Sequence, residues 1–173
     1  MRFIRDWSVW REDMAKEKIQ FEVNGKQVSL EVDPDELLID VLRDHLDLKG
    51  AKAGCRAGEC GACSVILNDR VVTSCLIPAI KADGGKITTV EGLEKDGQLH
   101  PLQKTFVEKG AIQCGFCTPG MLLSAKNLLD QNPRPSIQQI KTAISGVLCR
   151  CTGYQKIVDA IYSASKTISG KEV

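Results

Sequence analysis

Cysteine is the residue type whose number and spacing could do chemistry in this chain. Eight cysteines occur among 173 residues, in two groups that are well separated in the sequence. The first group is Cys55, Cys60, Cys63 and Cys75, and the second group is Cys114, Cys117, Cys149 and Cys151. Thiols at such close spacing form disulfides, hold zinc or hold an iron–sulfur cluster.

Disulfides suit the rest of the sequence least. The chain is 43% hydrophobic and long enough to bury a core without covalent cross-links. Residues 1–18 lack the apolar stretch of a secretory signal, and no apolar run approaches the roughly 20 residues that span a bilayer. We therefore expect a cytoplasmic protein without a membrane span, and a reducing cytoplasm disfavours stable disulfides.

The charge balance gives no support to a nucleic-acid-binding function. The sequence has 23 lysines and arginines against 22 aspartates and glutamates, for a formal net charge of +1. Surfaces that bind nucleic acid carry a clear excess of basic residues. We therefore expect a globular protein without a nucleic-acid partner.

Spacing favours iron–sulfur clusters over zinc. Cys55, Cys60 and Cys63 are spaced C-x4-C-x2-C, as in plant-type [2Fe-2S] ferredoxins. The C-x2-C pair of Cys114 and Cys117 also occurs in four-cysteine zinc sites, so spacing alone leaves zinc open. Glycines and alanines surround the first group and would let backbone amides approach a cluster whose charge is about −2 when oxidised.

The sequence around the first group predicts a small α+β domain that ends near residue 92. Residues 18–23 and 27–32 alternate as strands, and Asn24-Gly25 between them is typical of a type I′ hairpin turn. A helix is expected from Asp33 as N-cap, with Pro34 in the first turn and Glu36 completing a capping box. Further strands follow the cysteine loop at 64–68, 70–74 and 86–92.

The second half of the sequence predicts helices alone. Helical patterning covers residues 99–109, 119–130, 136–146 and 154–168. Ser136 and Gln139 form a capping box, and Gly146 is expected to end that helix in a left-handed conformation. The second cysteine group lies at helix ends, where backbone amides favour an anionic cluster.

Together these motifs resemble a known family. The segments GCRAGECGACSVIL with Cys75, QCGFCTPGM and LCRCTGYQKIVDAI resemble the small subunit with two [2Fe-2S] clusters of the molybdenum hydroxylases. That family includes xanthine dehydrogenases, aldehyde oxidoreductases and carbon monoxide dehydrogenases, and the resemblance covers residues 18–168. It implies a plant-ferredoxin-like β-grasp domain followed by an all-α four-helix-bundle [2Fe-2S] domain.

The resemblance also implies domain limits. We expect the ferredoxin-like domain at 18–92 and the helical domain at 93–173, after an N-terminal extension at 1–17. The extension contains Trp7 and Trp10 and lies outside the resemblance. A disordered leader and a segment that docks on a partner subunit through its tryptophans both remain open.

The resemblance gives each cysteine a role as a metal ligand and names no catalytic residue. The first group would bind the cluster nearer the flavin, and the second group the cluster nearer molybdenum. Gln113 and Cys151 would also contact the pterin of the molybdenum cofactor. The chain ends after the second cluster group, so the resemblance places a molybdopterin-type cofactor on a large partner subunit and FAD on a medium one. We expect a heteromeric complex that is a dimer of heterotrimers.

The expected function is electron transfer. Electrons would pass from molybdenum through both clusters to FAD during hydroxylation of a purine or another N-heterocycle, in a xanthine dehydrogenase-like enzyme. The same role in an aldehyde-oxidising or carbon monoxide-oxidising enzyme is the nearest alternative. A redox-sensing or binding module is the alternative of another class, and the match at both cysteine groups disfavours it because a sensor needs only one cluster.

Overall fold

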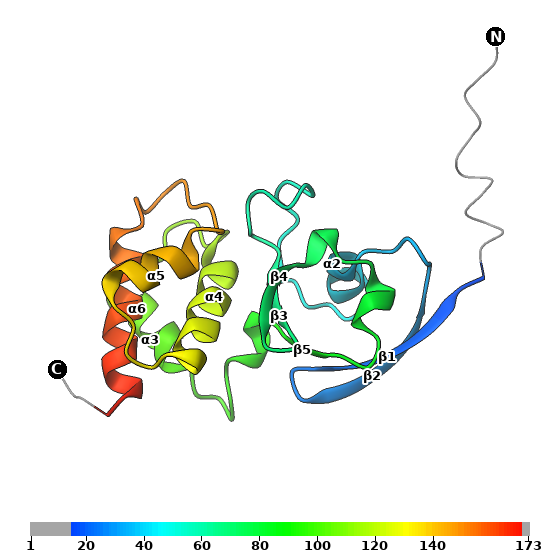
Figure 1. Ribbon diagram of the computed structural model, residues 1–173, viewed down its shortest axis with the longest axis horizontal. Helices are drawn as coiled ribbons and strands as arrows, with labels where there is room; N and C mark the ends of the chain where they lie inside the picture. Colours follow the sequence, from blue (N-terminus) through cyan, green and yellow to red (C-terminus); the bar gives the residue numbers. More distant parts are fainter. Residues whose placement is uncertain (1–14, 171–173) are drawn as a thin grey trace, which may run out of the picture.

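The computed structural model describes residues 15–170, which form a mixed β-sheet followed by helices (Figure 1). The strands are β1 (Glu17–Val23), β2 (Lys26–Val32), β3 (Ser64–Leu67), β4 (Arg70–Thr73) and β5 (Lys86–Thr88). Their order is β2-β1-β5-β3-β4, with β1 parallel to β5 and the other neighbours antiparallel. This is the ferredoxin-like β-grasp arrangement that was expected. Trp7 and Trp10 lie outside the described residues, so both interpretations of the extension stay predictions.

Two tight turns connect neighbouring strands. Asn24 and Gly25 have φ angles of 51° and 81°, and Asn68 and Asp69 have φ angles of 49° and 62°. Both loops contain two residues with positive φ, as a type I′ turn requires. The turn at Asn24-Gly25 therefore agrees with the sequence-based prediction, and the second hairpin has the same turn chemistry.

The helix expected from Asp33 begins later. Asp33 and Glu36 form a turn, in which the Asp33 N–H donates to Glu36 Oε2 at 3.4 Å, but no helix starts there. The helical segment consists of α2 (Leu38–Asp40) and the π-helical η1 (Val41–His45). The Leu38 N–H donates to the Ile77 carbonyl oxygen at 2.8 Å, and the Ala79 N–H donates to the Glu36 carbonyl oxygen at 2.8 Å. These long-range hydrogen bonds hold residues 36–38 extended, so the helix cannot start before Leu38.

The helical segment covers one face of the sheet. Leu38, Val41 and Leu42 are fully buried against strand residues such as Val65 and Ile87. Three short 3-10 helices complete this half of the chain: η2 (Ser74–Leu76), η3 (Ala79–Ala82) and η4 (Val90–Gly92). The apolar stripe therefore has the packing role that its helical spacing indicates.

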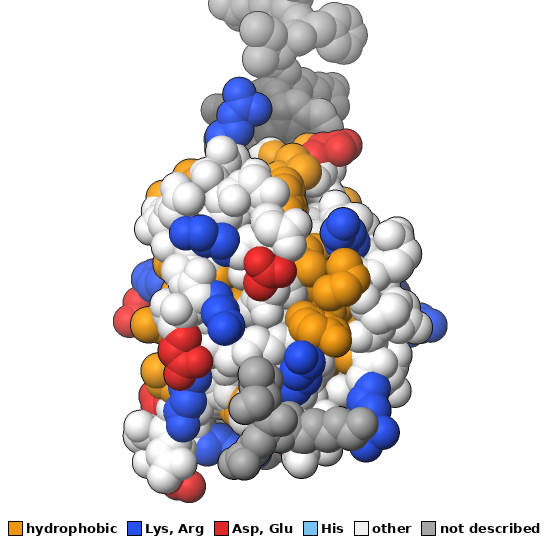
Figure 2. Space-filling model, turned by 90° about the vertical axis from the view of Figure 1, so that its left-hand side faces the viewer, with side chains coloured by type: hydrophobic (Ala, Val, Ile, Leu, Met, Phe, Trp, Pro, Cys, Tyr) orange, Lys and Arg blue, Asp and Glu red, His pale blue; other side chains and the backbone are white. Residues whose placement is uncertain are grey.

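Four α-helices form the second half of the structure. They are α3 (Pro101–Glu108), α4 (Thr118–Gln131), α5 (Ile137–Ile144) and α6 (Gln155–Ile168), each within two residues of its predicted bounds. Ser136 and Gln139 form the expected capping box, in which the Gln139 N–H donates to Ser136 Oγ at 3.2 Å. On the outer face of this bundle, lysine and arginine side chains are interspersed with acidic, polar and apolar ones (Figure 2).

Gly146 does not end α5 in the expected conformation. The C-cap is Ser145, in the right-handed helical region, and Gly146 is not among the residues with positive φ. The chain instead continues through Val147, which is 2% exposed and belongs to the core of the helical bundle. Burial of Val147 directs the backbone toward the first cysteine loop, so no left-handed cap forms.

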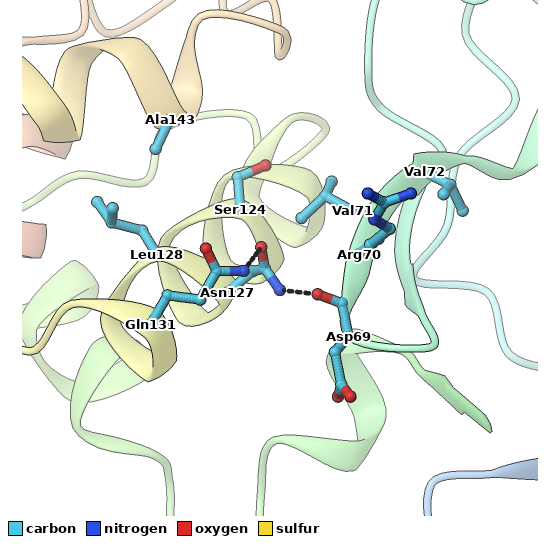
Figure 3. Close-up of a pocket in the computed structure, with 9 residues that line it drawn as sticks. All are labelled: Asp69, Arg70, Val71, Val72, Ser124, Asn127, Leu128, Gln131 and Ala143. Atoms are coloured by element: carbon cyan, nitrogen blue, oxygen red, sulfur yellow. Dashed lines mark hydrogen bonds between the residues drawn. The ribbon is translucent and has the colours of Figure 1, made fainter.

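Helix α4 joins the two halves. Ile66 of β3 belongs to the hydrophobic core of the helices, and α4 packs on β3 and β4. Asn127 Nδ2 donates to the Asp69 carbonyl oxygen at 2.7 Å across the crevice between α4 and the β3–β4 hairpin (Figure 3). The helical bundle is therefore fixed on the second face of the sheet.

The start of α3 generates a prediction about pH. His100 is the N-cap, and its Nδ1 accepts from the Leu102 N–H at 3.2 Å, which requires an unprotonated nitrogen. Burial and the nearby Lys126 lower the pKa of His100, so the unfolded chain binds this proton more readily than the folded chain. Stability should therefore fall as pH drops below about 6.5, by up to about 1 kcal/mol from this cap.

His100→Asn keeps a capping side chain that does not titrate in this range. We expect thermal unfolding of the wild type to lose stability relative to His100→Asn as pH is lowered from about 7.5 to 5. Acid effects on the thiol groups are common to both chains and cancel in the difference. Parallel curves over this range would contradict the capping role of neutral His100.

Candidate metal centres

The first cysteine group lies in the loop between η1 and β3. Cys55, Cys60 and Cys63 are in this loop, and Cys75 joins them from η2. Arg56, with a φ of 55°, and two loop glycines adopt left-handed conformations that turn the chain around the thiols. The second group is built from two connections, because Cys114 and Cys117 precede α4 whereas Cys149 and Cys151 lie between α5 and α6.

Within the first group the thiols associate in two pairs. The Cys55 thiol interacts with the Cys60 thiol, and the Cys63 thiol interacts with that of Cys75 and more weakly with that of Cys60. Cys55 is exposed and Cys60 half-buried, whereas Cys63 and Cys75 are each 2% exposed. The first group therefore has a solvent-facing pair and a buried pair.

The second group repeats this arrangement. The Sγ atoms of Cys114 and Cys151 are 3.6 Å apart and both residues are exposed. Cys117 is buried and interacts with the half-buried Cys149. A two-iron cluster with four thiolates needs two sulfurs on each iron, so two pairs match its donor set.

A single metal ion would require a different arrangement. Four donors of one zinc ion converge tetrahedrally on one point. In the part of the chain that the structure describes, no three histidine, cysteine, aspartate or glutamate side chains are arranged in this way. A metal site in either group would therefore be built from two pairs of thiols.

Burial separates the pKa values of these thiols. Burial raises the pKa of Cys63 to about 11, and burial together with the neighbouring Cys149 thiol raises the pKa of Cys117 to about 12. The pKa of Cys55 is lowered to about 7, chiefly by hydrogen bonds from the backbone amides of Ala57 and Cys60. The buried thiols consequently need metal to hold them as thiolates, because metal binding displaces the proton.

Neighbouring groups support the second site in ways that the sequence does not reveal. Thr152 Oγ1 lies 3.1 Å from Cys149 Sγ. The Cys149 N–H donates to the Tyr154 hydroxyl oxygen at 2.9 Å, and the Tyr154 N–H donates to Thr152 Oγ1 at 3.2 Å. Tyr154 is in the left-handed region with a φ of 69°. Tyr154 thus holds the cysteine turn in addition to packing against the bundle core.

The first loop is anchored by an ion pair. Arg56 donates to both carboxylate oxygens of Asp40 at 2.6 and 3.0 Å. This bidentate pair occupies the guanidinium that flanks Cys55, and it fixes the loop on α2. Nothing in the spacing of Asp40 and Arg56 indicates this contact, because the two residues meet only in the folded chain.

The glycines of the first loop serve different contacts. An added Cβ at Gly54 would lie 2.8 Å from Cys60 Sγ, so this glycine leaves room for a thiol. At Gly58 the Cβ would meet Leu76 Cδ1 at 2.4 Å, and at Gly50 it would meet Val90. Of these three glycines, only Gly54 lies against a thiol, whereas Gly58 packs on Leu76 and Gly50 lies against Val90 and the Glu91 carboxylate.

Gln113 lies at the exposed edge of the second group. It is next to Cys114 in sequence, precedes α4 and is exposed. Its side-chain amide makes no hydrogen bond with other described residues. Both donor and acceptor atoms of the amide are therefore free to meet a molecule outside this chain.

Comparisons with known proteins agree with this geometry. A family model described as "2Fe-2S iron-sulfur cluster binding domain" matches residues 21–89, and one described as "[2Fe-2S] binding domain" matches residues 89–162. The nicotinate dehydrogenase small FeS subunit of Eubacterium barkeri is 49% identical over 148 residues, which cover 86% of this chain and 94% of that protein. The chain belongs to the family of small iron–sulfur subunits of molybdenum hydroxylases.

Other members of the molybdenum hydroxylases share the same unit. The aldehyde oxidoreductase of Megalodesulfovibrio gigas is 49% identical over 87% of this chain, which spans only 17% of that longer protein. The structure of quinoline 2-oxidoreductase from Pseudomonas putida 86 superposes with a TM-score of 0.86 at 41% identity, covering 91% of this chain and 99% of that chain. The small-subunit family thus occurs both as separate chains and as part of a fused protein.

Family membership decides between the metals. The chain carries two [2Fe-2S]-binding domains of an oxidoreductase family, so zinc is no longer an alternative. In the described residues no helix is both long and apolar enough to cross a membrane. The crevice between α4 and the β3–β4 hairpin is lined by residues such as Arg70, Ser124 and Gln131 and contains no thiol (Figure 3).

Tyr154→Phe tests the support of the second cysteine turn. The change removes the acceptor of the Cys149 N–H, which should lower the free energy of unfolding by about 1 kcal/mol. We expect faster loss of the helical-domain cluster than of the other cluster when the loaded chain is heated with a chelator. Absorbance and paramagnetic resonance spectra follow the two clusters separately.

Tyr162→Phe is the matched control, because Tyr162 of α6 is 39% exposed and its hydroxyl makes no hydrogen bond with the described residues. This control should lose both clusters at wild-type rates. Equal effects of the two substitutions, or equal loss of both clusters in Tyr154→Phe, would contradict the supporting role of Tyr154.

Proposed function

We propose that this chain is the electron-transfer subunit of a heteromeric molybdenum hydroxylase. With the clusters bound, the second cysteine group would take electrons from the molybdopterin side and the first group would pass them on toward FAD. The observation that carries the proposal is the presence of two four-thiol groups, each with a more exposed and a more buried thiol pair, in a chain of this family. The exposed pair of the second group can face the electron donor, and the exposed pair of the first group can face the electron acceptor.

All eight cysteines act as cluster ligands in this proposal. Cys55, Cys60, Cys63 and Cys75 hold one [2Fe-2S] cluster, and Cys114, Cys117, Cys149 and Cys151 hold the other. A bound [2Fe-2S] cluster supplies one-electron transfer. The backbone amides around Cys55 and the hydroxyl of Thr152 near Cys149 donate toward thiolate sulfur and stabilise its negative charge.

The exposed side of the second group would face the molybdenum cofactor of a partner subunit. Gln113 could hydrogen-bond an edge of its pterin through the free side-chain amide, and Cys151 Sγ could accept a hydrogen bond from the pterin while serving as an iron ligand. Support comes from the exposure of Gln113 and of the Cys114 and Cys151 thiols on one side of the group. The chain itself contributes no catalytic residue and binds no substrate.

The partners and substrate follow from the relatives. We infer a large molybdopterin-binding subunit and a medium FAD-binding subunit, assembled as a dimer of heterotrimers in the cytoplasm, where eight free cysteines stay reduced. The names of the nicotinate and quinoline enzymes support an N-heteroaromatic substrate, and a purine belongs to that class. The name of the aldehyde oxidoreductase supports the alternative of an aldehyde substrate.

The metal content tests the ligand sets. The purified chain should contain about four iron and four acid-labile sulfide atoms, without stoichiometric zinc, as two [2Fe-2S] clusters require. Reduction with dithionite should give two distinct paramagnetic species, because one cluster lies in a glycine-rich loop and the other at helix ends. Zinc at either group, or a single species that accounts for all reduced iron, would overturn the assignment.

Substitutions at Gln113 and Cys151 test the pterin contact in the complete complex. Gln113→Ala should keep both clusters and either slow electron flow from substrate to flavin or weaken retention of the molybdenum cofactor. Cys151→Ala should lose or convert the helical-domain cluster and spare the other. Clusters are counted spectroscopically, and molybdenum and flavin reduction are then followed separately after mixing with substrate.

Gln138→Ala, at an exposed glutamine of α5 remote from the cysteines in sequence, is the control and should behave as the wild type. Wild-type electron flow with full cofactor occupancy in Gln113→Ala would show that the pterin contact is wrong. Two native cluster signals in Cys151→Ala would show that the ligand set is wrong.

A further inference from the structure

The turn between β1 and β2 contains Asn24-Gly25, and Asn-Gly is among the dipeptides most prone to spontaneous deamidation. The backbone nitrogen of Gly25 attacks the side-chain carbonyl carbon of Asn24, because glycine has no Cβ to obstruct the approach. A bond forms between this carbon and the Gly25 nitrogen, the bond from the carbon to the amide nitrogen breaks, and ammonia leaves with the Gly25 proton. Water then opens the five-membered succinimide ring, which gives aspartate or isoaspartate.

In the folded chain the Asn24 side chain is hydrogen-bonded to a distant residue. Asn24 Nδ2 donates to Thr89 Oγ1 at 2.9 Å, and Asn24 Oδ1 accepts from the Thr89 N–H at 2.9 Å. Thr89 is fully buried directly after β5, 65 positions further along the chain. Both ends of the amide are thus bonded to one residue, and we call this pair of hydrogen bonds the Asn24–Thr89 clamp.

Neighbouring residues fix the position of the clamp. Thr89 Oγ1 donates its own proton to Glu91 Oε2 at 2.5 Å, so toward Asn24 it acts as an acceptor. Glu91 Oε1 in turn accepts from the Gly50 N–H at 2.7 Å. An added Cβ at Gly92 would overlap the Asn24 side chain, so glycine at position 92 leaves the room that the amide occupies.

Ring closure is incompatible with this arrangement. The side-chain carbonyl carbon has to turn from Thr89 toward the Gly25 nitrogen, which breaks both hydrogen bonds of the clamp. The turn also has to change, because Asn24 and Gly25 have the φ angles of a type I′ turn, 51° and 81°, and the succinimide ring does not fit the backbone of that turn. The reaction therefore proceeds from molecules in which the turn has opened locally.

We propose that Asn24 is a deamidation site that the Asn24–Thr89 clamp protects, and that its conversion permanently releases the β1–β2 turn from the end of β5. An aspartate carboxylate has no proton to donate to Thr89 Oγ1, and it places a second negative charge beside the hydroxyl that already bonds Glu91. An isoaspartate lengthens the backbone of the two-residue turn by a carbon atom, so the clamp cannot form again.

The released turn lies beside the connection between the two halves of the chain. Thr89 immediately precedes η4, and η4 packs on α4. The clamp therefore ties the first hairpin of the sheet to the segment that leads into the helices. Its loss loosens the sheet side of this connection, and the modified residue remains as a record that the turn has opened.

Thr89→Val tests the clamp, with Thr88→Val as the matched control. Each change removes one threonine hydroxyl at the end of β5, but the Thr88 hydroxyl makes no hydrogen bond with the described residues. The full chain is kept in warm neutral buffer, and conversion of Asn24 is followed by peptide mass spectrometry. Thr89→Val should convert about tenfold faster than the wild type, because loss of a buried hydrogen bond raises the fraction of open molecules by about this factor. Thr88→Val should convert at the wild-type rate.

Gly92→Ala displaces the Asn24 side chain while keeping every hydrogen-bonding group, and it should also convert faster than the wild type. The wild type in denaturant gives the unprotected rate, and the folded wild type should convert at least about tenfold more slowly. A folded Thr89→Val or Gly92→Ala chain that converts at the wild-type rate would overturn the protective role of the clamp. If neither variant folds, the two wild-type rates decide, and equal rates would overturn it.

The released turn is tested on the modified chains themselves. Conversion adds a negative charge, so chains that contain isoaspartate at position 24 can be separated from unmodified chains by ion exchange. Hydrogen exchange of the Thr89 amide should be about tenfold faster in the modified chains, because its acceptor is lost, whereas the amides of α6 should exchange at unchanged rates. Equal exchange of the Thr89 amide in both fractions would show that conversion does not release the turn.

Discussion

Four cysteine sulfurs can share one small volume as thiolates only if positive charge lies among them. Burial raises the pKa of Cys63 to about 11 and that of Cys117 to about 12, so without metal these two sulfurs keep their protons. Metal binding supplies the missing charge and releases the protons. The positive-φ loop around Cys55, the helix start at Cys117 and the Thr152–Tyr154 turn are arranged around this requirement.

The two halves satisfy the requirement with different local structures. The first site uses a loop that is anchored on α2 by Arg56 and Asp40 and is closed from the sheet side by Cys75. The second uses two connections that only the helical bundle brings together. Because α4 packs on both the bundle and the sheet, the two sites are parts of one packed structure.

Much of this structure could be predicted from the sequence because it depends on local chemistry. The turn at Asn24-Gly25 and the capping box at Ser136 are specified within a few residues, and both form as predicted. The grouping of the cysteines by spacing agrees with the two domains of the family. The local signals at Asp33 wrongly predicted that a helix begins there. Hydrogen bonds of residues 36 and 38 with residues 77–79 keep this segment extended, so the helix begins only at Leu38.

Features of the site that depend on contacts between distant segments could not be predicted. The division of each group into exposed and buried pairs needs the folded positions of η2 and of the turn before α6. Gly146 was expected to end a helix, but burial of Val147 decides the path of the chain there. The Arg56–Asp40 pair likewise joins residues whose separation in sequence carries no signal.

The outward-facing thiol pairs have a consequence for the order of biosynthesis. Cys55 in the first group and Cys114 and Cys151 in the second are exposed, whereas Cys63, Cys75 and Cys117 are buried. With the proposed ligand sets, iron and sulfide would enter each site from the side of its exposed thiols. Subunits that carry flavin and molybdopterin would cover these same sides in the proposed complex. If the partner subunits dock over these thiols as proposed, both clusters would have to be inserted before docking.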